Sequence, residues 1–183
     1  MSRLWVIGWI AILFCEGCSF DYWEAQVPEE LEDTIPNIVM EGFQQTVVSR
    51  GTVVLRVQVD RAESFEKKKR TVFQGVRFYE YDEEGKLITE GKADRVVYYF
   101  DTKNAEAYGN LWVHSVREEG MIYAETLLWN DKERTLSSPE GQQVRLQDEE
   151  GSWIEGIGFL ADMKRLIITY SGSVLGEYVQ EKK

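Results

Sequence analysis

The stretch that decides the fold class is VVLRVQVD, residues 53–60. Every second position in it is apolar: Val53, Leu55, Val57 and Val59. They alternate with Val54, Arg56, Gln58 and Asp60. A period of two places alternate side chains on opposite faces of a β-strand. The stretch therefore predicts a strand with one buried face.

The same alternation recurs along the chain. Shorter runs place Val76 and Phe78, Leu111 and Val113, and Val144 and Leu146 in the apolar phase. Acidic turns that contain glycine separate these runs, at residues 82–85, 118–120 and 148–151. Glycine readily adopts the positive φ that many hairpin turns require. Beyond residue 45 no run of ten residues has a helical period, so the sequence predicts an all-β fold.

An internal repeat supports this interpretation. Ala62-Glu63, Ala93-Asp94 and Ala124-Glu125 are spaced 31 residues apart. The segments VHSVREEG (113–120) and VRLQDEEG (144–151) also match without gaps. A period of this length predicts stacked hairpin units that bury a continuous apolar face against one another.

The first residues indicate export. Arg3 precedes the apolar run LWVIGWIAILF, residues 4–14, and this run is shorter than the roughly 20 residues that span a bilayer. Residues 1–17 are therefore predicted to be a lipoprotein signal peptide, with lipidation of Cys18 as the first residue of the mature chain. Each buried CH₂ of an acyl chain contributes about 0.8 kcal/mol to membrane binding. The alternative is a short membrane anchor that is not cleaved. Both interpretations place the remaining chain outside the cytoplasm.

Two domains are predicted after this segment. Residues 18–45 are expected to form an acidic spacer, because residues 19–38 contain two of the three prolines and six acidic side chains. Residues 46–183 are expected to form the β-domain. Both cysteines precede it, so no disulfide is expected there. The net charge of −11 argues against nucleic-acid binding and against broad adhesion to anionic lipid.

The sequence shows little catalytic potential. His114 is the single histidine, and the mature domain has no cysteine, so neither a metal site nor a cofactor is expected. Most carboxylates belong to turn segments. An enzyme that acts on carbohydrate is kept as a third hypothesis by these carboxylates and by Trp112 and Trp153. The basic run at residues 67–70 is interpreted as a solvated hairpin tip, with contact to lipid phosphates as the alternative.

The apolar strand phases admit two interpretations. They can form a sealed sandwich core, as in a structural or adhesive envelope lipoprotein. They can also line a groove, open along one side, that accepts acyl chains. The candidate groove residues are Val53, Leu55, Val57, Val59, Val76, Phe78, Leu111, Val113, Val144, Leu146, Ile157 and Phe159.

Several short segments follow one another in a recognisable order: GVRFYEYDEEG (75–85), Ala93-Asp94, AETLLWNDK (124–132), LSSPE (136–140), EGIGFLAD (155–162) and SGSVLG (171–176). This order of segments resembles the LptC family of lipopolysaccharide export. The related LptA and LptD periplasmic domains share some of these segments. The resemblance implies a twisted antiparallel β-jelly-roll with an open apolar groove and no catalytic residue.

The resemblance also implies partners. The domain would accept lipopolysaccharide, or a related envelope lipid, from an ABC transporter of the inner membrane and pass it to an LptA-like bridge protein. The first strand, around Val53–Val59, would face the transporter. The last strand, within residues 166–179, would pair with the bridge protein through the edge that carries Leu166, Ile168 and Val174. The protein would be periplasmic and anchored to the inner membrane, by lipid at Cys18 where the family usually has a transmembrane helix.

Overall fold

A computed structural model describes residues 34–179, which lie in one compact unit, Asp33–Lys183. The predicted signal peptide 1–17, the lipidation site Cys18 and the first part of the predicted spacer lie outside the described residues. Every regular element within residues 34–179 is a β-strand. The predicted all-β class is confirmed.

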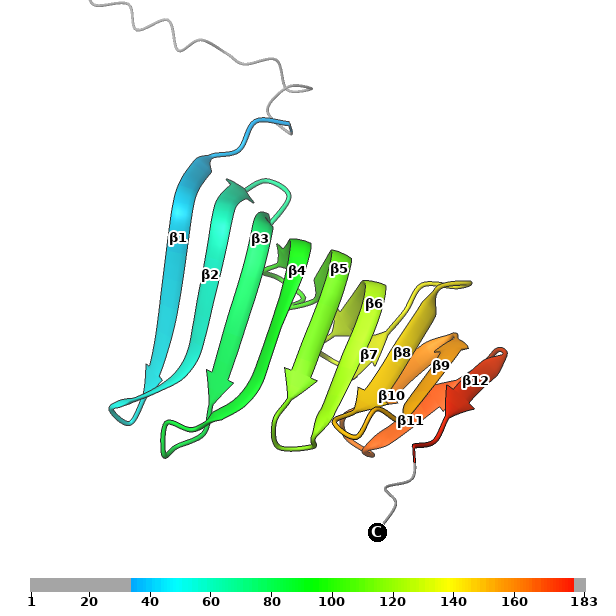
Figure 1. Cartoon of the computed structure of the whole chain (residues 1–183). Coiled ribbons are helices and arrows are strands. Elements are labelled where there is room, and N and C mark those ends of the chain that lie inside the picture. The colour runs from blue at the N-terminus through cyan, green and yellow to red at the C-terminus, as the bar shows by residue number, and fades with distance from the viewer. Residues whose placement is uncertain (1–33, 180–183) are drawn as a thin grey trace, which may run out of the picture. The chain divides into compact units, whose positions relative to one another are not determined.

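Twelve strands form one antiparallel sheet (Figure 1). In chain order they are β1 (Ile38–Ser49), β2 (Thr52–Phe65), β3 (Arg70–Tyr81), β4 (Leu87–Tyr99), β5 (Ala105–Ser115), β6 (Gly120–Asn130), β7 (Thr135–Ser137), β8 (Gln143–Asp148), β9 (Trp153–Ile157), β10 (Phe159–Asp162), β11 (Ile167–Tyr170) and β12 (Val174–Glu177).

The sheet branches at β6. Strands β1 to β6 pair in chain order as a meander. The last residues of β6, Leu128–Asn130, pair with β7, and its first residues, Gly120–Ala124, pair with β8. One branch continues through β7, β10 and β11, and the other through β8, β9 and β12. Figure 1 shows the two branches as separate layers at the C-terminal end of the sheet. The result is an open jelly-roll with a space between the branches.

The long strands are bent where glycines take positive φ in their middle. Gly42 in β1, Gly75 in β3 and Gly109 in β5 have φ of +58°, +63° and +76°. The pairing of β5 with both neighbours shifts register at this level. Gly75 and Gly109 each lie against an aspartate of the preceding strand, Asp60 or Asp94. The shift in β5 is a β-bulge, which increases bend and twist, whereas the pairings on either side of Gly42 and Gly75 keep their register.

The predicted boundaries need two corrections. Residues 38–45 belong to β1, so the spacer cannot extend to residue 45. The stretch Val53–Val59 lies in β2, which is hydrogen-bonded to β1 on one side and to β3 on the other. The prediction that it is the first strand is wrong, and its edges are not free to pair with a partner.

The predicted repeat corresponds to alternate strands of the meander. Ala62 lies in β2, Ala93 in β4 and Ala124 in β6. Each unit of 31 residues is therefore one hairpin. Two of the three predicted turns place glycine at positive φ, at Gly85 and Gly151. In the third turn Glu119, at φ +52°, takes the position expected for Gly120.

The densest core lies where the two branches meet β4, β5 and β6. Its buried members are Ala93, Leu111, Leu127, Val144, Phe159 and Ala161. Phe159 is 1% exposed, and its ring centroid lies 5.6 Å from that of Tyr170. This cluster seals the space between the branches at one level of the sheet.

Candidate functional site: an apolar groove

An unsealed apolar groove lies beside this core, between the two branches. Its floor is a row of side chains that register places directly opposite one another on neighbouring strands. The row consists of Val57, Phe78, Gly91, Val113, Ile122, Leu146 and Ile154. Because facing residues of paired strands share one face of a sheet, the row forms a continuous apolar strip.

The branch formed by β7, β10 and β11, called the second branch from here on, forms the opposite wall of the groove. Leu136 of β7 and Ile168 of β11 both pair with Ala161 of β10 and therefore share its face. Leu136, Ile168 and Met163, which follows β10, line a hollow of about 1040 Å³ together with Val113, Ile122, Leu146 and Ile154 of the floor. Ile154 and Met163 remain 39% and 43% exposed, and Ile168 is 51% exposed. The groove thus leaves apolar surface in contact with water.

The rim of the groove is polar. The next row along the strands contains Glu80, Thr89, Ser115, Gly120 and Asp148. These residues line the same hollow. An apolar floor with a polar rim suits a ligand that has apolar chains and a polar head.

The structure divides the predicted groove residues into groups. Val113 and Leu146 line the groove. Val57 and Phe78 belong to the floor row on β2 and β3, and Val59 and Val76 are buried on these two strands.

The other predicted groove residues lie elsewhere. Leu111, Val144 and Phe159 belong to the sealed core. Val53 and Leu55 lie toward the start of β2, where they pair with Val48 and Val47 of β1. Ile157 is in the opposite phase of β9, since Gly156 pairs with Val144 and Ile157 with Gln143. Ile157 is therefore outside the groove.

The residues of the predicted partner edge lie on different parts of the structure. Residues 166–179 form two short strands at two different edges, because β11 pairs with β10 and β12 with β9. Leu166 precedes β11 and is 86% exposed. Ile168 and Val174 line the groove. The prediction of one last strand is therefore wrong.

Sequence reasoning missed several groove residues for a simple reason. Ile122 lies between Met121 and Tyr123, so its stretch of β6 is apolar on both faces and shows no alternation. Met163 lies in a turn. Ile122 lies directly opposite Val113 on the neighbouring strand. Aligning β5 with β6 in this register would have identified Ile122 as a groove residue.

His114 has two carboxylate contacts. Its Nδ1 lies 3.5 Å from an oxygen of Glu90, and its Nε2 lies 3.2 Å from an oxygen of Glu149. Its side chain is 19% exposed. It therefore joins β4 and β5 to the turn after β8. Within residues 34–179 no three His, Cys, Asp or Glu side chains come together in a way that could hold a metal ion.

Tyr170 links the core to the second branch. Its hydroxyl donates a hydrogen bond to the carbonyl oxygen of Val144 at 3.3 Å. Burial, and then the negative charge of Glu155, raise the pKa of Tyr170 to about 12. In Tyr108 a hydrogen bond to Glu106 is the main cause of a pKa that is also raised to about 12.

Because the pKa values of Tyr170 and Tyr108 are raised, we expect the folded protein to lose stability at alkaline pH. A phenol with its pKa raised by folding keeps its proton in the folded state while the unfolded chain loses it above about pH 10. This contribution to stability is complete below pH 10 and is lost as pH rises through about 12. Tyr170→Phe should therefore reduce the slope of unfolding free energy against pH between 10 and 12, measured by urea titration. Tyr178→Phe, at a side chain 78% exposed, is the control and should leave the slope unchanged.

The fold and the groove define a β-jelly-roll protein with one open apolar face. The sequence matches the family described as "Lipopolysaccharide-assembly, LptC-related" over residues 7–179. The chain belongs to this LptC-related family, as its short segments predict. A search of curated proteins found no match.

The fold is also similar to a solved structure. This is the crystal structure of LptH, the LptA-homologous periplasmic component of the conserved lipopolysaccharide transport device from Pseudomonas aeruginosa. The TM-score is 0.52 at 16% sequence identity, and the match covers 69% of this chain and 95% of that chain. Among the described residues, none forms a helix long and apolar enough to cross a bilayer.

Proposed function

We propose that this chain carries lipopolysaccharide, or a related envelope lipid, across part of the periplasm. It accepts the lipid from an ABC transporter of the inner membrane and passes it to an LptA-like bridge protein. The groove is the observation that carries the proposal, because its apolar floor shields acyl chains from water and its polar rim suits a headgroup. Membership of the LptC-related family supports the same role. The protein acts as a carrier and not as an enzyme.

Strand edges provide the contacts with neighbouring proteins. β1 has one edge without a partner strand among residues 34–179, and it is 12 residues long. Its exposed Val47 and Val48 suit docking to another apolar surface. We assign this edge to the transporter, in place of Val53–Val59. The short edges β11 and β12 then face the LptA-like partner, because edge pairing extends a sheet from one chain to the next.

Lipid at Cys18 anchors the protein to the inner membrane, and the chain is periplasmic from there on. Mass spectrometry of the protein purified from membranes tests this anchor. The expected mature chain begins at Cys18 and carries the added mass of its acyl groups. Recovery of a chain that begins at Met1 with an unmodified Cys18 would support the short uncleaved anchor.

Photo-crosslinking in the envelope tests the lipid path. A photoreactive residue at Val113 or Ile122 should capture lipid while the transporter is active, because both side chains line the groove. The matched control is His114, the next residue of the same strand as Val113, on the opposite face of the sheet. Lipid is identified by the mass of the adduct.

The control decides between the two leading functions. Capture at Val113 and Ile122 that far exceeds capture at His114 is the expected result. Equal capture on both faces, or none on either, would contradict the carrier role. That result would favour a structural or adhesive envelope lipoprotein with a sealed core.

A further inference from the structure

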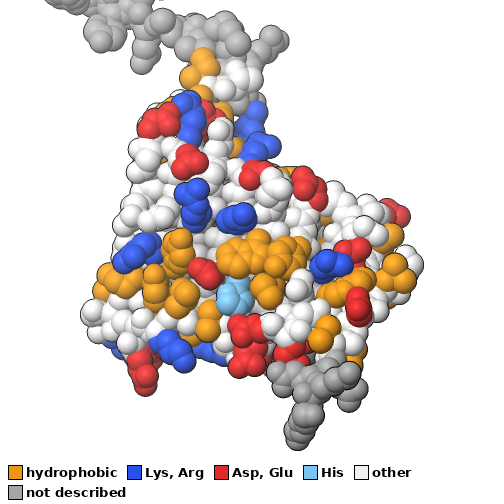
Figure 2. Space-filling view, in the orientation of Figure 1, with side chains coloured by type: hydrophobic (Ala, Val, Ile, Leu, Met, Phe, Trp, Pro, Cys, Tyr) orange, Lys and Arg blue, Asp and Glu red, His pale blue; other side chains and the backbone are white. Residues whose placement is uncertain are grey.

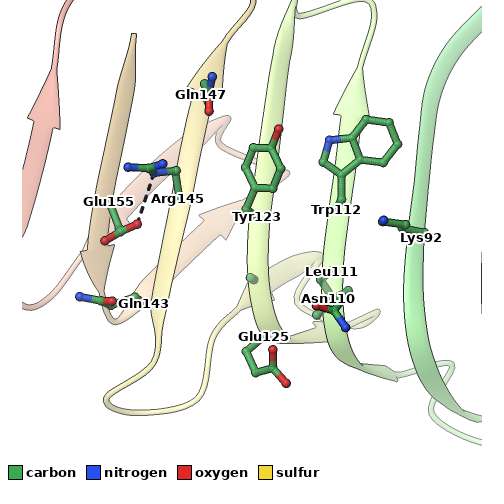
Figure 3. A pocket seen from close by; sticks show the side chains of 11 residues that line it. Lys92, Asn110, Leu111, Trp112, Tyr123, Glu125, Gln143, Arg145, Gln147 and Glu155 are labelled. Atoms are coloured by element: carbon green, nitrogen blue, oxygen red, sulfur yellow. Dashed lines mark ion pairs between the residues drawn. The ribbon is translucent and has the colours of Figure 1, made fainter. Parts of the chain in front are cut away.

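The outer face of the sheet, opposite the groove, has a second row of aligned side chains. In register across β3, β4, β5, β6, β8 and β9 it contains Arg77, Lys92, Trp112, Tyr123, Arg145 and Glu155. From Lys92 onward the row lines a shallow hollow of about 830 Å³. Figure 3 shows the rings of Trp112 and Tyr123 side by side on this face. None of these residues belongs to the lipid path.

The first two members of the outer row are cations that face each other. Arg77 pairs directly with Lys92 across β3 and β4, and both are exposed. Within the described part of the chain neither has a carboxylate at ion-pair distance. Like charges directly opposite each other destabilise a sheet. In a chain with a net charge of −11, an uncompensated cation pair is a site that favours an anion.

The other cation of the row is already engaged. The guanidinium of Arg145 lies 3.3 Å from Glu155 and 4.1 Å from the centre of the Trp153 ring. Arg145 therefore serves as a fixed part of the surface. Figure 2 shows the outer face with Lys and Arg side chains beside a band of hydrophobic side chains, next to the single histidine.

The aromatic and amide groups of the outer hollow favour a sugar. The C–H groups on one face of a pyranose ring pack against flat aromatic rings such as Trp112 and Tyr123. The amides of Asn110, Gln143 and Gln147 line the same hollow, together with the carboxylates of Glu125 and Glu155, and these groups can bind hydroxyl groups. Neighbouring strands are about 4.8 Å apart, which is close to the length of one sugar unit in an extended chain. Successive sugars can thus lie over successive strands, from the aromatic rings to the cations.

We propose that this outer hollow binds an anionic saccharide chain. Sugar rings stack on Trp112 and Tyr123, and a carboxylate or phosphate of the saccharide lies at Lys92 and Arg77. The saccharide is separate from any lipid in the groove, because the hydrogen-bonded strands β4, β5, β6 and β8 separate the two faces. The proposal therefore does not depend on the carrier function.

Calorimetric titration of the full chain in detergent micelles at low ionic strength tests the proposal. The probes are a hyaluronan hexasaccharide, which carries carboxylates, the neutral chitohexaose, and hexaglutamate, which has charge without sugar. The hyaluronan hexasaccharide should bind at least tenfold more tightly than either of the other two. Equal affinity for chitohexaose would overturn the role of the cations, and equal affinity for hexaglutamate would overturn the role of the sugar. Absence of binding to all three would overturn the site.

Two variants separate binding from folding. Trp112→Ala should weaken binding of the hyaluronan hexasaccharide about tenfold, a loss typical of one aromatic contact. Lys92→Glu should abolish binding while the melting temperature stays the same or rises, because the new carboxylate pairs with Arg77.

The controls Phe100→Ala and Lys103→Glu change an exposed aromatic ring and a cation at the turn between β4 and β5. Both should bind as the unmodified protein does. Unchanged binding by Lys92→Glu, or equal losses in the controls, would contradict the site. A groove change such as Val113→Asp should impair lipid capture and leave this binding intact.

Discussion

Phe159→Ala is expected to lower the free energy of unfolding by about 3–5 kcal/mol, the range for truncating a fully buried phenylalanine. Phe159 is 1% exposed and packs against the ring of Tyr170. Its backbone is fixed as well, since the amide of Phe159 donates to Ser138 Oγ at 3.2 Å and the amide of Ser138 donates to the Phe159 carbonyl oxygen at 3.0 Å. The surroundings cannot collapse into the cavity easily. A loss of this size is a large part of the stability of an ordinary domain.

Urea denaturation followed by tryptophan fluorescence measures this effect. The neighbouring change Leu160→Ala is the control, because Leu160 is in the opposite phase of β10 and is 41% exposed. It should cost less than about 1 kcal/mol. Equal and small losses for the two variants would contradict the core role of Phe159. Such a result would favour the prediction from the sequence that Phe159 lines the groove. Truncation of Phe159 would then change lipid capture more than stability.

This distinction was not available from the sequence. Alternation places Phe159 and Val113 in the same class, because both are apolar residues of a strand phase that faces inward. Which of them is sealed depends on the second branch of the sheet, where Tyr170 covers Phe159. The branch arises because β6 pairs with two different strands at its two ends, and no local pattern encodes this choice.

Local signals predicted much of the remaining fold. The alternation at residues 53–60 and the repeat at Ala62, Ala93 and Ala124 correspond to β2 and to the hairpin units. Strand β1 was missed because its first residues continue a segment rich in proline and acidic residues. The phase of β2 also changes within the strand. Val59 and Ala62 are both buried although they are three positions apart, because the pairing of β2 with β3 is interrupted at Val59 and Asp60. A period of two cannot be followed through such a position.

Gly75 lies against Asp60, and Gly109 lies against Asp94 in the same way. The last prediction concerns Gly109. Gly109→Ala should lower the free energy of unfolding by about 2–4 kcal/mol. Gly109 has φ of +76°, which costs a residue with a Cβ about 1 kcal/mol or more. A Cβ at this position would also lie 2.6 Å from Oδ2 and 2.8 Å from Cβ of Asp94, so β4 would have to shift. Asp94 cannot move freely, because Asn110 donates a hydrogen bond to it at 2.7 Å.

Gly42→Ala separates the two causes. Gly42 has φ of +58°, and no atom lies within 4 Å of the place where a Cβ would be. Gly42→Ala should therefore lower the free energy of unfolding only by the backbone cost of positive φ, about 1 kcal/mol. Chemical denaturation of both variants measures the difference. Equal losses would mean that the contact with Asp94 is relieved without cost. A much larger loss for Gly109→Ala would show that the close approach of β4 and β5 at the bend leaves no room for a Cβ.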